Sequence, residues 1–323
     1  MIKKLSKTLK EKHISQFTAI SAAPKTIKEK VLLKISDVPE SIDISYTHTP
    51  LCLQPLIIGI LTQDLLIIND SKRAELWIVR SEVTNNENSS AQNKIMATIR
   101  LKYFNTLEIK KNTNVIFFNV EKSSLLQSTK IETLKYIWSL YLHFLKAQKR
   151  NSFSFLNNLA ALYSFPRKVI LNIIKTDAHF NIFPMDLVSE LPGEDILILG
   201  LNINNRSVDE IIRTKKMIIV EPIPDSKEMV YGFAGNHRKK MIESDFADKY
   251  KTNSEMYCFP VPDFVRSYKE ISLIKYLKLG SHYILVCKIE NQKIIDSEKD
   301  LLYHISTIHH LYLKRQNDFY SVV

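Results

Sequence analysis

The sequence predicts a β-rich α+β protein, with an antiparallel β-barrel in the C-terminal half, a smaller β-rich domain before it, and helices connecting the two. Short runs rich in Ile, Val, Leu, Phe and Tyr occur in both halves of the chain, as expected for strands. Helical spacing of apolar residues is confined to a few segments, and strands and helices do not alternate as a doubly wound parallel sheet requires. A length of 323 residues indicates about two domains.

Residues 1–30 form a basic tail. The tail holds eight Lys and two Glu, so it contributes +6 to the formal net charge of +11. Phe17 is its single aromatic residue, whereas a nucleic-acid surface combines Lys and Arg with stacking rings. We therefore expect a solvated, partly helical arm and no nucleic-acid partner.

Membrane insertion, export and disulfide bonding are not expected. The longest apolar runs, such as PLIIGIL and ILILGL, are much shorter than the ~20 residues of a membrane span, and the tail resembles neither a secretory signal nor a transit peptide. Cys52, Cys258 and Cys287 are odd in number and widely spaced, which fits neither a disulfide framework nor a metal site. We expect three small buried side chains and a reducing cytoplasm.

Residues 31–130 are expected to form the smaller β-rich domain, whose role the sequence leaves open. Its predicted strands are PLIIGIL, DLLIIND, AELWIVR, KIMATIRLKYF and NVIFFNV, with Trp77 as a packing residue. The polar residues 84–93 are predicted to form an exposed loop. No chemistry is assigned to residues 31–150, because they contain no Gly-rich phosphate loop, no His pair at ligand spacing and no nucleophile elbow. The six glycines of the chain nowhere form G-x-G-x-x-G, which excludes a Rossmann fingerprint.

Residues 131–163 are predicted to be a helical connection. The segment IETLKYIWSLYLHFLKAQKR has helical spacing and a basic last turn. Its apolar stripe is interpreted as core packing, and its members are Leu134, Ile137, Trp138, Tyr141, Leu142 and Leu145. A second helix is expected over residues 153–163, with Asn151 or Ser152 as its N-cap.

Residues 164–323 are expected to form the barrel. Its strands include KVILNIIKT, DILILGLNI, KMIIVEPI and two closing strands around LGSHYIL. SVDEIIRT is predicted to be a short helix, with Ser207 as N-cap and Glu210 at the capping-box position. Residues 180–193, FNIFPMDLVSELPG, lie between two strand-like runs and are longer than the two to five residues of a simple hairpin turn. We interpret them as a functional loop.

Three polar clusters lie in this half of the chain. They are Asn181, Asp186 and Ser189 in the loop; GNHRKK at 235–240; and Ser281 with His282 in LGSHYIL. A phosphate requires hydroxyls, main-chain N–H groups and fixed positive charge, which Ser189, Arg206, Ser207 and GNHRKK can supply. Each cluster also has a structural interpretation: a turn cap at Asp186, a solvated run of charge, and a core histidine at His282.

The order of five blocks, FNIFPMDL with LPG, ILGLNINNRSVDEI, FAGNHRKK, FPVPDFVRSYKEI and GSHYILVCKIEN, resembles the flavin reductase family, which folds as an FMN-binding split barrel. The resemblance covers residues from about 160 to 314, and the first 150 residues resemble no family. One departure is residues 184–187, where the wider family usually carries a hydroxyl-rich Thr/Ser-Ser run.

The resemblance implies FMN in a groove at a homodimer interface. The loop would lie along the isoalloxazine ring, mainly through main-chain groups, with the residues Asn181, Phe183, Pro184, Met185, Asp186, Leu187 and Ser189. The next two blocks would lie near the phosphate or ribityl chain, with Arg206, Ser207, Asn236, His237 and Arg238. Ser281 and His282 match a position near the reacting edge of the flavin, which makes His282 the candidate catalytic residue. No metal site is expected.

These residues predict a flavin reductase-like oxidoreductase that transfers hydride from NADH or NADPH to bound FMN. One alternative is a flavin- or haem-binding protein that uses the same barrel without nicotinamide turnover. Another is that the N-terminal half is the functional part and the barrel is a dimerisation scaffold. The sequence determines neither the nicotinamide nor the final electron acceptor.

Overall fold

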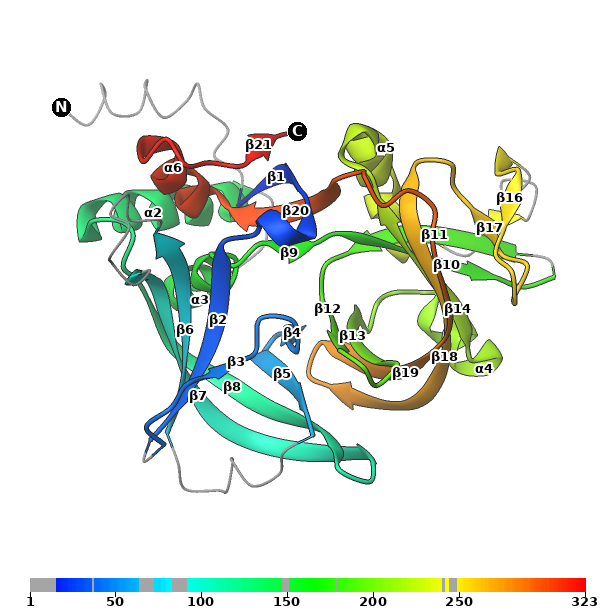
Figure 1. Cartoon of the computed structure of the whole chain (residues 1–323), viewed down its shortest axis with the longest axis horizontal. Helices are drawn as coiled ribbons and strands as arrows, with labels where there is room; N and C mark the ends of the chain where they lie inside the picture. Colours follow the sequence, from blue (N-terminus) through cyan, green and yellow to red (C-terminus); the bar gives the residue numbers. More distant parts are fainter. Residues whose placement is uncertain are drawn as a thin grey trace.

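The computed structural model describes residues 16–323 apart from 37, 64–72, 83–91, 147–150, 178, 240–241 and 244–248. The predicted strand DLLIIND, residues 1–15 of the basic tail and most of the predicted loop at 84–93 lie outside the described residues. Figure 1 shows two β-rich bodies side by side, with helices gathered at one end of the first. The predicted class, a β-rich protein with antiparallel sheets and few helices, is confirmed.

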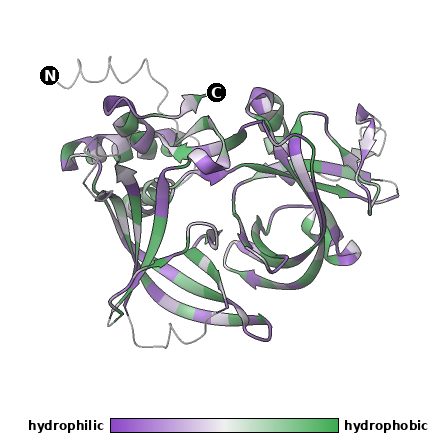
Figure 2. Ribbon diagram, in the orientation of Figure 1, coloured by the Kyte–Doolittle hydropathy of each residue, from purple (hydrophilic) through white to green (hydrophobic). Residues whose placement is uncertain are grey.

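The first body contains a seven-stranded antiparallel sheet, here called the N-terminal sheet, in the order β3-β2-β6-β7-β8-β5-β4. Its strands are β2 (Glu29–Ile35), β3 (Ile42–Asp43), β4 (His48–Leu53), β5 (Leu56–Thr62), β6 (Ala74–Glu82), β7 (Gln92–Lys110) and β8 (Thr113–Leu125). Hydrophobic and hydrophilic residues alternate along the long β7–β8 hairpin, as Figure 2 shows, because one face of the sheet packs on the core.

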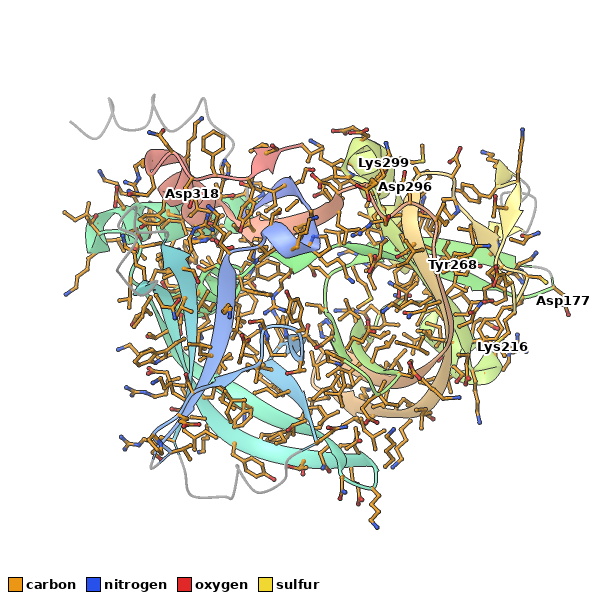
Figure 3. All side chains as sticks on the ribbon, viewed as in Figure 1. Asp177, Lys216, Tyr268, Asp296, Lys299 and Asp318 are labelled. Carbon is orange, nitrogen blue, oxygen red and sulfur yellow. The ribbon has the colours of Figure 1, made fainter. Side chains whose placement is uncertain are left out.

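The second body contains an eight-stranded antiparallel sheet, the C-terminal sheet, in the order β12-β13-β19-β18-β14-β10-β11-β15. Its strands are β10 (Ile170–Lys175), β11 (His179–Met185), β12 (Val188–Leu191), β13 (Ile196–Asn202), β14 (Lys216–Pro222), β15 (Ile242–Glu243), β18 (Val265–Leu279) and β19 (His282–Ile294). The sheet curls into a rounded shell (Figure 1). Both faces of the sheet are packed: Phe183, Leu197 and Ile219 belong to one apolar cluster, and Tyr268, labelled in Figure 3, is buried in another with Val220 and Val230.

The segment 180–193, predicted to be a loop, is mostly strand. It provides β11 and β12, and only Asp186 and Leu187 separate them. Phe180, Ile182 and Phe183 are buried, so this segment contributes to the core as well as to the surface. Pro184 is accommodated in β11 because only the first residues of that strand pair with β15, which leaves the N–H side of position 184 at a free edge.

A small four-stranded sheet joins the ends of the chain to its middle, in the order β21-β1-β20-β9. Its strands are β1 (Phe17–Ala22), β9 (Arg167–Lys168), β20 (Leu301–Ser306) and β21 (Ser321–Val322). A two-stranded sheet of β16 (Thr252–Asn253) and β17 (Pro260–Val261) lies at the far end of the second body.

The helices are short except α2. The described elements are α2 (Lys130–Lys146), α3 (Phe153–Leu162), α4 (Val208–Thr214), α5 (Lys227–Gly232) and α6 (Thr307–Arg315), with 3₁₀ turns η1 (Pro24–Thr26), η2 (Pro224–Ser226) and η3 (Phe233–Arg238). None of the described helices is long and apolar enough to cross a membrane. Ser152 caps α3 as predicted, since its Oγ accepts a hydrogen bond from the Phe155 N–H at 3.1 Å. The predicted capping box at Ser207 is wrong, because the Ser207 side chain makes no cap hydrogen bond.

Two predictions of burial are corrected by the structure. Ile137 packs in the core as predicted, but Leu134, Trp138, Leu142 and Leu145 are exposed because they lie on the opposite face of α2. Cys52 and Cys287 are buried as predicted, whereas Cys258 is exposed. The backbone of Cys258 has φ 55, so it lies in a tight turn at the surface and not in the core.

The two bodies meet through a continuous apolar core. Leu51, Ile57 and Phe117 of the N-terminal sheet share a cluster with Ile198 and Val286 of the C-terminal sheet. Gly200 on β13 permits this approach, since a Cβ atom there would lie 2.3 Å from the carbonyl oxygen of Leu51. The relative position of the two sheets is therefore fixed by side-chain packing and by one close backbone contact.

A buried charge network attaches the C-terminus to the N-terminal sheet. Glu29 accepts hydrogen bonds from Arg80, Tyr320 and, at 3.0 Å, His309. Burial alone would raise the pKa of Glu29, but His309 and Arg80 lower it below its ordinary value. Arg80 also reaches Asp318 at 2.9 Å, near α6 (Figure 3). The C-terminal segment thus belongs structurally to the first body.

Candidate functional site

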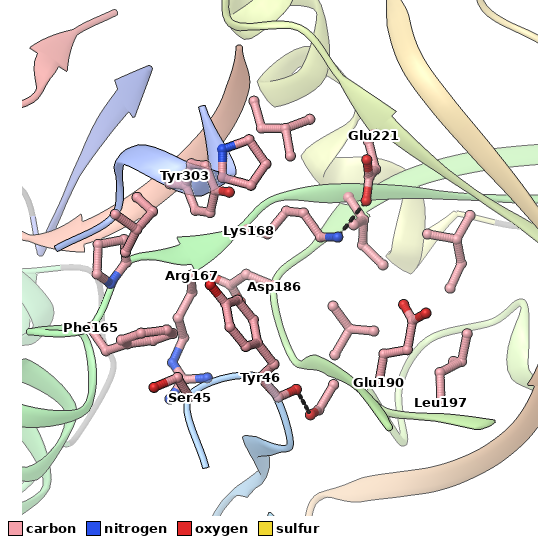
Figure 4. A pocket seen from close by; sticks show the side chains of 18 of the residues that line it. Ser45, Tyr46, Phe165, Arg167, Lys168, Asp186, Glu190, Leu197, Glu221 and Tyr303 are labelled. Atoms are coloured by element: carbon pink, nitrogen blue, oxygen red, sulfur yellow. Dashed lines mark hydrogen bonds and ion pairs between the residues drawn. The ribbon is translucent and has the colours of Figure 1, made fainter. Parts of the chain in front are cut away.

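The main candidate site is a cavity of about 330 Å³ where the two bodies meet. We call it the junction cavity. Figure 4 shows its wall, which combines Ser45 and Tyr46 from the loop before β4 with Phe165 and Arg167 and with residues of the C-terminal sheet. Most of the wall is apolar, and the apolar residues are Pro24, Ile27, Phe165, Pro166, Ile170, Val188, Pro192, Leu197, Ile219 and Leu301. Such a wall suits a flat, largely apolar ligand with a few polar groups.

Arg167 is the most unusual polar group of the cavity wall. It is only 4% exposed, and its Nε has no hydrogen-bond partner. Its Nη2 donates to Nε2 of His48 at 3.0 Å, and its guanidinium lies 5.6 Å from the ring centroid of Tyr163. Burial lowers the pKa of Arg167, and Tyr163 and Asp186 oppose that effect. A buried guanidinium with an unused N–H is suited to bind an anion.

His48 orients Arg167 and is held neutral. Its Nδ1 donates to the carbonyl oxygen of Ile44 at 2.7 Å, which leaves Nε2 as the acceptor for Arg167. Burial, and secondarily the charge of Arg167, lowers the pKa of His48 to about 3. His48 therefore acts as a fixed hydrogen-bond acceptor at neutral pH and not as a proton donor.

Asp186 lies at the centre of a hydrogen-bonded chain beside the cavity. Its Oδ2 accepts from Tyr163 at 2.9 Å and from Nδ1 of His304 at 2.7 Å, and Tyr231 contacts Nε2 of His304 at 2.8 Å. Burial alone would raise the pKa of Asp186, but His304, Tyr163 and Arg167 lower it. Burial and Asp186 raise the pKa of Tyr163 well above its ordinary value. Asp186 is therefore a fixed carboxylate at neutral pH.

The other cations of the wall already have partners. Lys168 forms an ion pair with Glu221 (Figure 4), and Lys269 forms one with Glu190. Burial would lower the pKa of Lys168, but Glu221 raises it. Arg266 donates to the carbonyl oxygen of Ser297 at 2.9 Å. Among the lining cations, Arg167 alone has neither a carboxylate nor a carbonyl as a hydrogen-bond acceptor in the described part of the chain.

The edge of the C-terminal sheet supplies main-chain groups to the site. β12 is the end strand of that sheet, and β4 and β5 lie near it. The Gly200 N–H donates to the Leu187 carbonyl at 3.0 Å. Because residues of an antiparallel strand alternate between facing the neighbouring strand and facing away from it, the N–H and C=O of Val188 and Glu190 point away from β13. Both residues line the junction cavity. Ser189 fastens β12 to the first body by donating to the carbonyl oxygen of Tyr46 at 2.7 Å.

A second group of predicted residues gathers elsewhere. Asn181 Nδ2 donates to Ser207 Oγ at 2.7 Å and to the Asn236 carbonyl at 3.3 Å, and Asn236 Nδ2 donates back to the Ile182 carbonyl at 3.0 Å. Arg206 N–H donates to the carbonyl of His237 at 3.0 Å. Arg206, His237 and Arg238 line a separate polar cavity of about 750 Å³ near α4.

Ser281 and His282 occupy a third position, where the β18–β19 turn meets the β4–β5 turn. Ser281 Oγ contacts Nδ1 of His282 at 2.8 Å and accepts from the Gln54 N–H at 3.2 Å. His282 is 3% exposed, and burial lowers its pKa to about 4. It lines neither of the two cavities.

Of the residues predicted from the sequence, the structure brings Asp186 and Ser189 to the junction cavity. Phe183 packs in the core of the C-terminal sheet with Met185 against it, and Leu187 is buried immediately before β12. The sequence did not point to five residues at or beside the cavity: Tyr46, His48, Arg167, Tyr303 and His304. A signal for Arg167 was present, since Arg-Lys directly precedes the buried run VILNII. The described residues contain no group of three or more His, Cys, Asp or Glu placed to hold a metal ion.

Comparison with known proteins gives no family assignment and finds solved structures that are similar to part of the chain. No family model matches the chain, and no curated protein matches it. Among solved structures, the flavin reductase PheA2 is 16% identical with a TM-score of 0.37 and covers 45% of this chain and 90% of its own. The NADH:FAD oxidoreductase SgcE6 of Streptomyces globisporus C-1027 is 9% identical with a TM-score of 0.40, covering 45% and 85%. BorF, the flavin reductase component of a bacterial tryptophan halogenase, is 11% identical with a TM-score of 0.40, covering 46% and 95%. The solved structures found include flavin reductases and FMN-binding proteins, the family that the C-terminal blocks resemble.

Proposed function

We propose that this chain binds FMN in the junction cavity and reduces it with hydride from NADH or NADPH. The observation that carries the proposal is the buried Arg167, which lines the apolar cavity together with the free edge of β12 and whose Nε has no hydrogen-bond partner. We further propose that the curled C-terminal sheet is the split barrel that the resemblance implies.

The residues of the cavity fit the three parts of FMN. The guanidinium of Arg167 would donate to the phosphate, since its Nε has no hydrogen-bond partner and its one printed side-chain hydrogen bond, to His48, uses Nη2. The main-chain groups of Val188 and Glu190, which point away from β13, would be available to hydrogen-bond polar atoms of the flavin, as a strand edge does with a peptide. The apolar wall, with Phe165 and Leu197, packs against the ring faces.

When bound, FMN supplies the capacity to accept a hydride and pass electrons onward. The protein orients the ring, excludes water and stabilises negative charge at the ring edge through the outward N–H groups of Val188 and Glu190. Asp186 stays ionised and holds His304 and Tyr163 in place. His282 remains a predicted catalytic residue, and a specific loss of turnover in His282→Ala, without loss of bound FMN, would support that role.

The N-terminal half takes part in this proposed site. Ser45, Tyr46 and His48 belong to that half and form one side of the wall. A single chain therefore supplies both sides of the cavity, in the place where the resemblance implies a second subunit. The alternative, in which the N-terminal half alone is functional and the barrel is a dimerisation scaffold, gives no role to a cavity lined by residues of both halves.

A flavin-binding protein without nicotinamide turnover is the second candidate. The cavity volume of about 330 Å³ favours it, because ligand pockets span about 300–1,000 Å³ and the lower end holds one ring system and not two stacked ones. A haem-binding protein is less well supported. Both ring nitrogens of His48 and of His304 already have hydrogen-bond partners, so neither offers a free axial ligand.

The test is an absorbance titration of the purified full chain with FMN, followed by anaerobic addition of NADH or NADPH. Binding with a shift of the flavin band near roughly 450 nm, followed by bleaching, supports the reductase. Binding without bleaching supports the second candidate. If FMN does not bind even at concentrations well above the dissociation constants of typical flavoproteins, both candidates are refuted.

A further inference from the structure

Helix α2 is hydrophobic on two opposite faces. Tyr136, Ile137 and Leu140 face the core and are 5%, 3% and 1% exposed. On the other side lies a row that we call the α2 stripe: Ile131, Leu134, Trp138, Leu142 and Leu145, exposed by 67%, 63%, 49%, 41% and 41%. With 3.6 residues per turn, these five side chains fall within roughly 80° of the helix circumference. Figure 1 shows α2 at the outer end of the first body, near α6, and the exposed fractions show that no described segment covers the stripe.

Neighbouring rings hold the central residue of the stripe in place. Trp138 stacks on Tyr141 at 5.8 Å and on Phe153 of α3 at 5.5 Å, and Tyr141 stacks on Phe153 at 4.6 Å. A large aromatic side chain that is already ordered loses little conformational entropy on binding. Trp is also among the residues that most often dominate the binding energy of an interface.

We propose that the α2 stripe is a dimer interface that binds the α2 stripe of a second copy of this chain, antiparallel and with Trp138 on the two-fold axis. The intervals between successive stripe residues are 3, 4, 4 and 3, so the pattern reads the same in both directions from Trp138. A two-fold interface requires such self-complementarity. In this antiparallel arrangement, Trp138 would contact the partner's Trp138, Leu134 would contact the partner's Leu142, and Ile131 would contact the partner's Leu145.

The area of the stripe is sufficient for a specific dimer. From the exposed fractions, the five side chains present on the order of 500 Å² per copy, or about 1,000 Å² in a pair. That total reaches the lower limit of specific interfaces, and the exposed part of Phe153 lies next to it. The predicted dimer is therefore of moderate affinity and depends on concentration.

The charges around the stripe favour the second copy over other occupants. Lys130 and Lys135 flank the stripe, and Glu132 is engaged by Arg315 and Thr129. The lysine-rich residues 1–15 would bring like charge to these lysines. In the antiparallel pair, each Lys130 is eight residues from the axis, so the two copies of it are separated by roughly 24 Å along the helices. Repulsion between the two copies of Lys130 is then largely screened. The two copies of Lys135, each three residues from the axis, are roughly 9 Å apart along the helices, so we expect salt to strengthen the dimer.

The first experiment measures the molar mass of the full chain by light scattering and sedimentation over a range of concentrations. We expect twice the mass of one chain at high concentration. Leu134→Glu and Trp138→Glu should each raise the dimer dissociation constant by roughly 30-fold or more. Leu134→Glu should change the melting temperature little, because Leu134 is 63% exposed, whereas Trp138→Glu should also lower it, because Trp138 stacks on Tyr141 and Phe153. His143→Glu is the matched control, since His143 is exposed on α2 away from the stripe and should leave the dimer intact.

The second experiment tests the orientation by oxidative cross-linking in a Cys258→Ser background, because Cys258 is the exposed native cysteine. Trp138→Cys should cross-link to its own copy, and Ile131→Cys should do so only when Leu145→Cys is mixed with it. A monomeric wild type at all concentrations overturns the proposal, as does a dimer that survives Trp138→Glu. A monomer that dimerises only after residues 1–15 are deleted also overturns it and identifies that segment as the occupant of the stripe. Recruitment of a monomer to anionic vesicles through Trp138 would overturn it in favour of a lipid surface.

Discussion

Replacing Arg167 with Met tests the proposed function at the residue on which it depends. Met keeps the apolar stem and removes the guanidinium, so the cavity loses its one unused buried donor. A hydrogen bond to a charged group contributes about 1.5–3 kcal/mol, which corresponds to a change of roughly 10- to 150-fold in dissociation constant. If Arg167 binds the phosphate, FMN affinity should fall by this factor, while riboflavin, which has no phosphate, should bind equally well to both proteins.

Quenching of flavin fluorescence on binding measures the affinities for FMN and for riboflavin in the same assay. The matched control is Lys269→Met, which removes another lining cation but one already paired with Glu190, and it should change FMN binding by less than about 1 kcal/mol. A thermal melt of each apo variant verifies folding, because Arg167→Met also removes the donor to His48. Equal loss of FMN and riboflavin affinity, or no loss of either, would refute the assignment of Arg167 to the phosphate.

Three further predictions concern stability. Burial holds the folded-state pKa of His48 at about 3 and that of His282 at about 4, whereas the pKa of histidine in the unfolded chain is about 6.5. The unfolded state therefore binds more protons than the folded state at acidic pH. The free energy of unfolding should accordingly fall as the pH decreases below about 6.5. Urea unfolding at several pH values gives the slope of the unfolding free energy against pH. His48→Gln should reduce this slope by roughly 1.4 kcal/mol per pH unit between pH 6 and 4. An unchanged slope would show that His48 is charged in the folded protein. Gly200→Ala should destabilise by about 1–3 kcal/mol because its Cβ would meet Leu51 at the contact between the bodies, whereas Gly232→Ala, with open space around it, should not destabilise. Ser152→Ala should cost about 1 kcal/mol through loss of the α3 cap, and Asn151→Ala should be neutral; equal effects would contradict the capping assignment.

Several elements followed from the sequence because local rules determine them. Runs such as NVIFFNV and DILILGLNI became β8 and β13, since dense β-branched residues favour strands in almost any context. Apolar residues spaced three or four positions apart over residues 131–145 predicted α2 correctly, but they did not show which of its two apolar faces would be buried. Periodicity identifies a face, and the partners available in the fold decide which face is covered.

The candidate site was harder to predict because it depends on contacts between distant segments. Asp186 and Ser189 were identified as polar residues of a segment between two strand-like runs, which was interpreted as a functional loop, but His48 and Arg167 are 119 positions apart and meet only in the folded chain. Nothing in the local sequence HTPLCL indicates that its histidine will accept a hydrogen bond from an arginine. Likewise, the capping pattern at Ser207 was satisfied in sequence, but Asn181 binds the hydroxyl in the structure.

The sequence by itself determined the β-rich class, the positions of most strands and helices, and the blocks that resemble a flavin-binding fold. These depend on propensities and periodicities that act over a few residues. The tertiary structure decided which polar side chains meet, because burial and long-range packing create the unpartnered Nε of Arg167, the neutral His48 and the shared wall of the junction cavity. Such properties arise when two segments exclude water from each other, and no single segment carries that information.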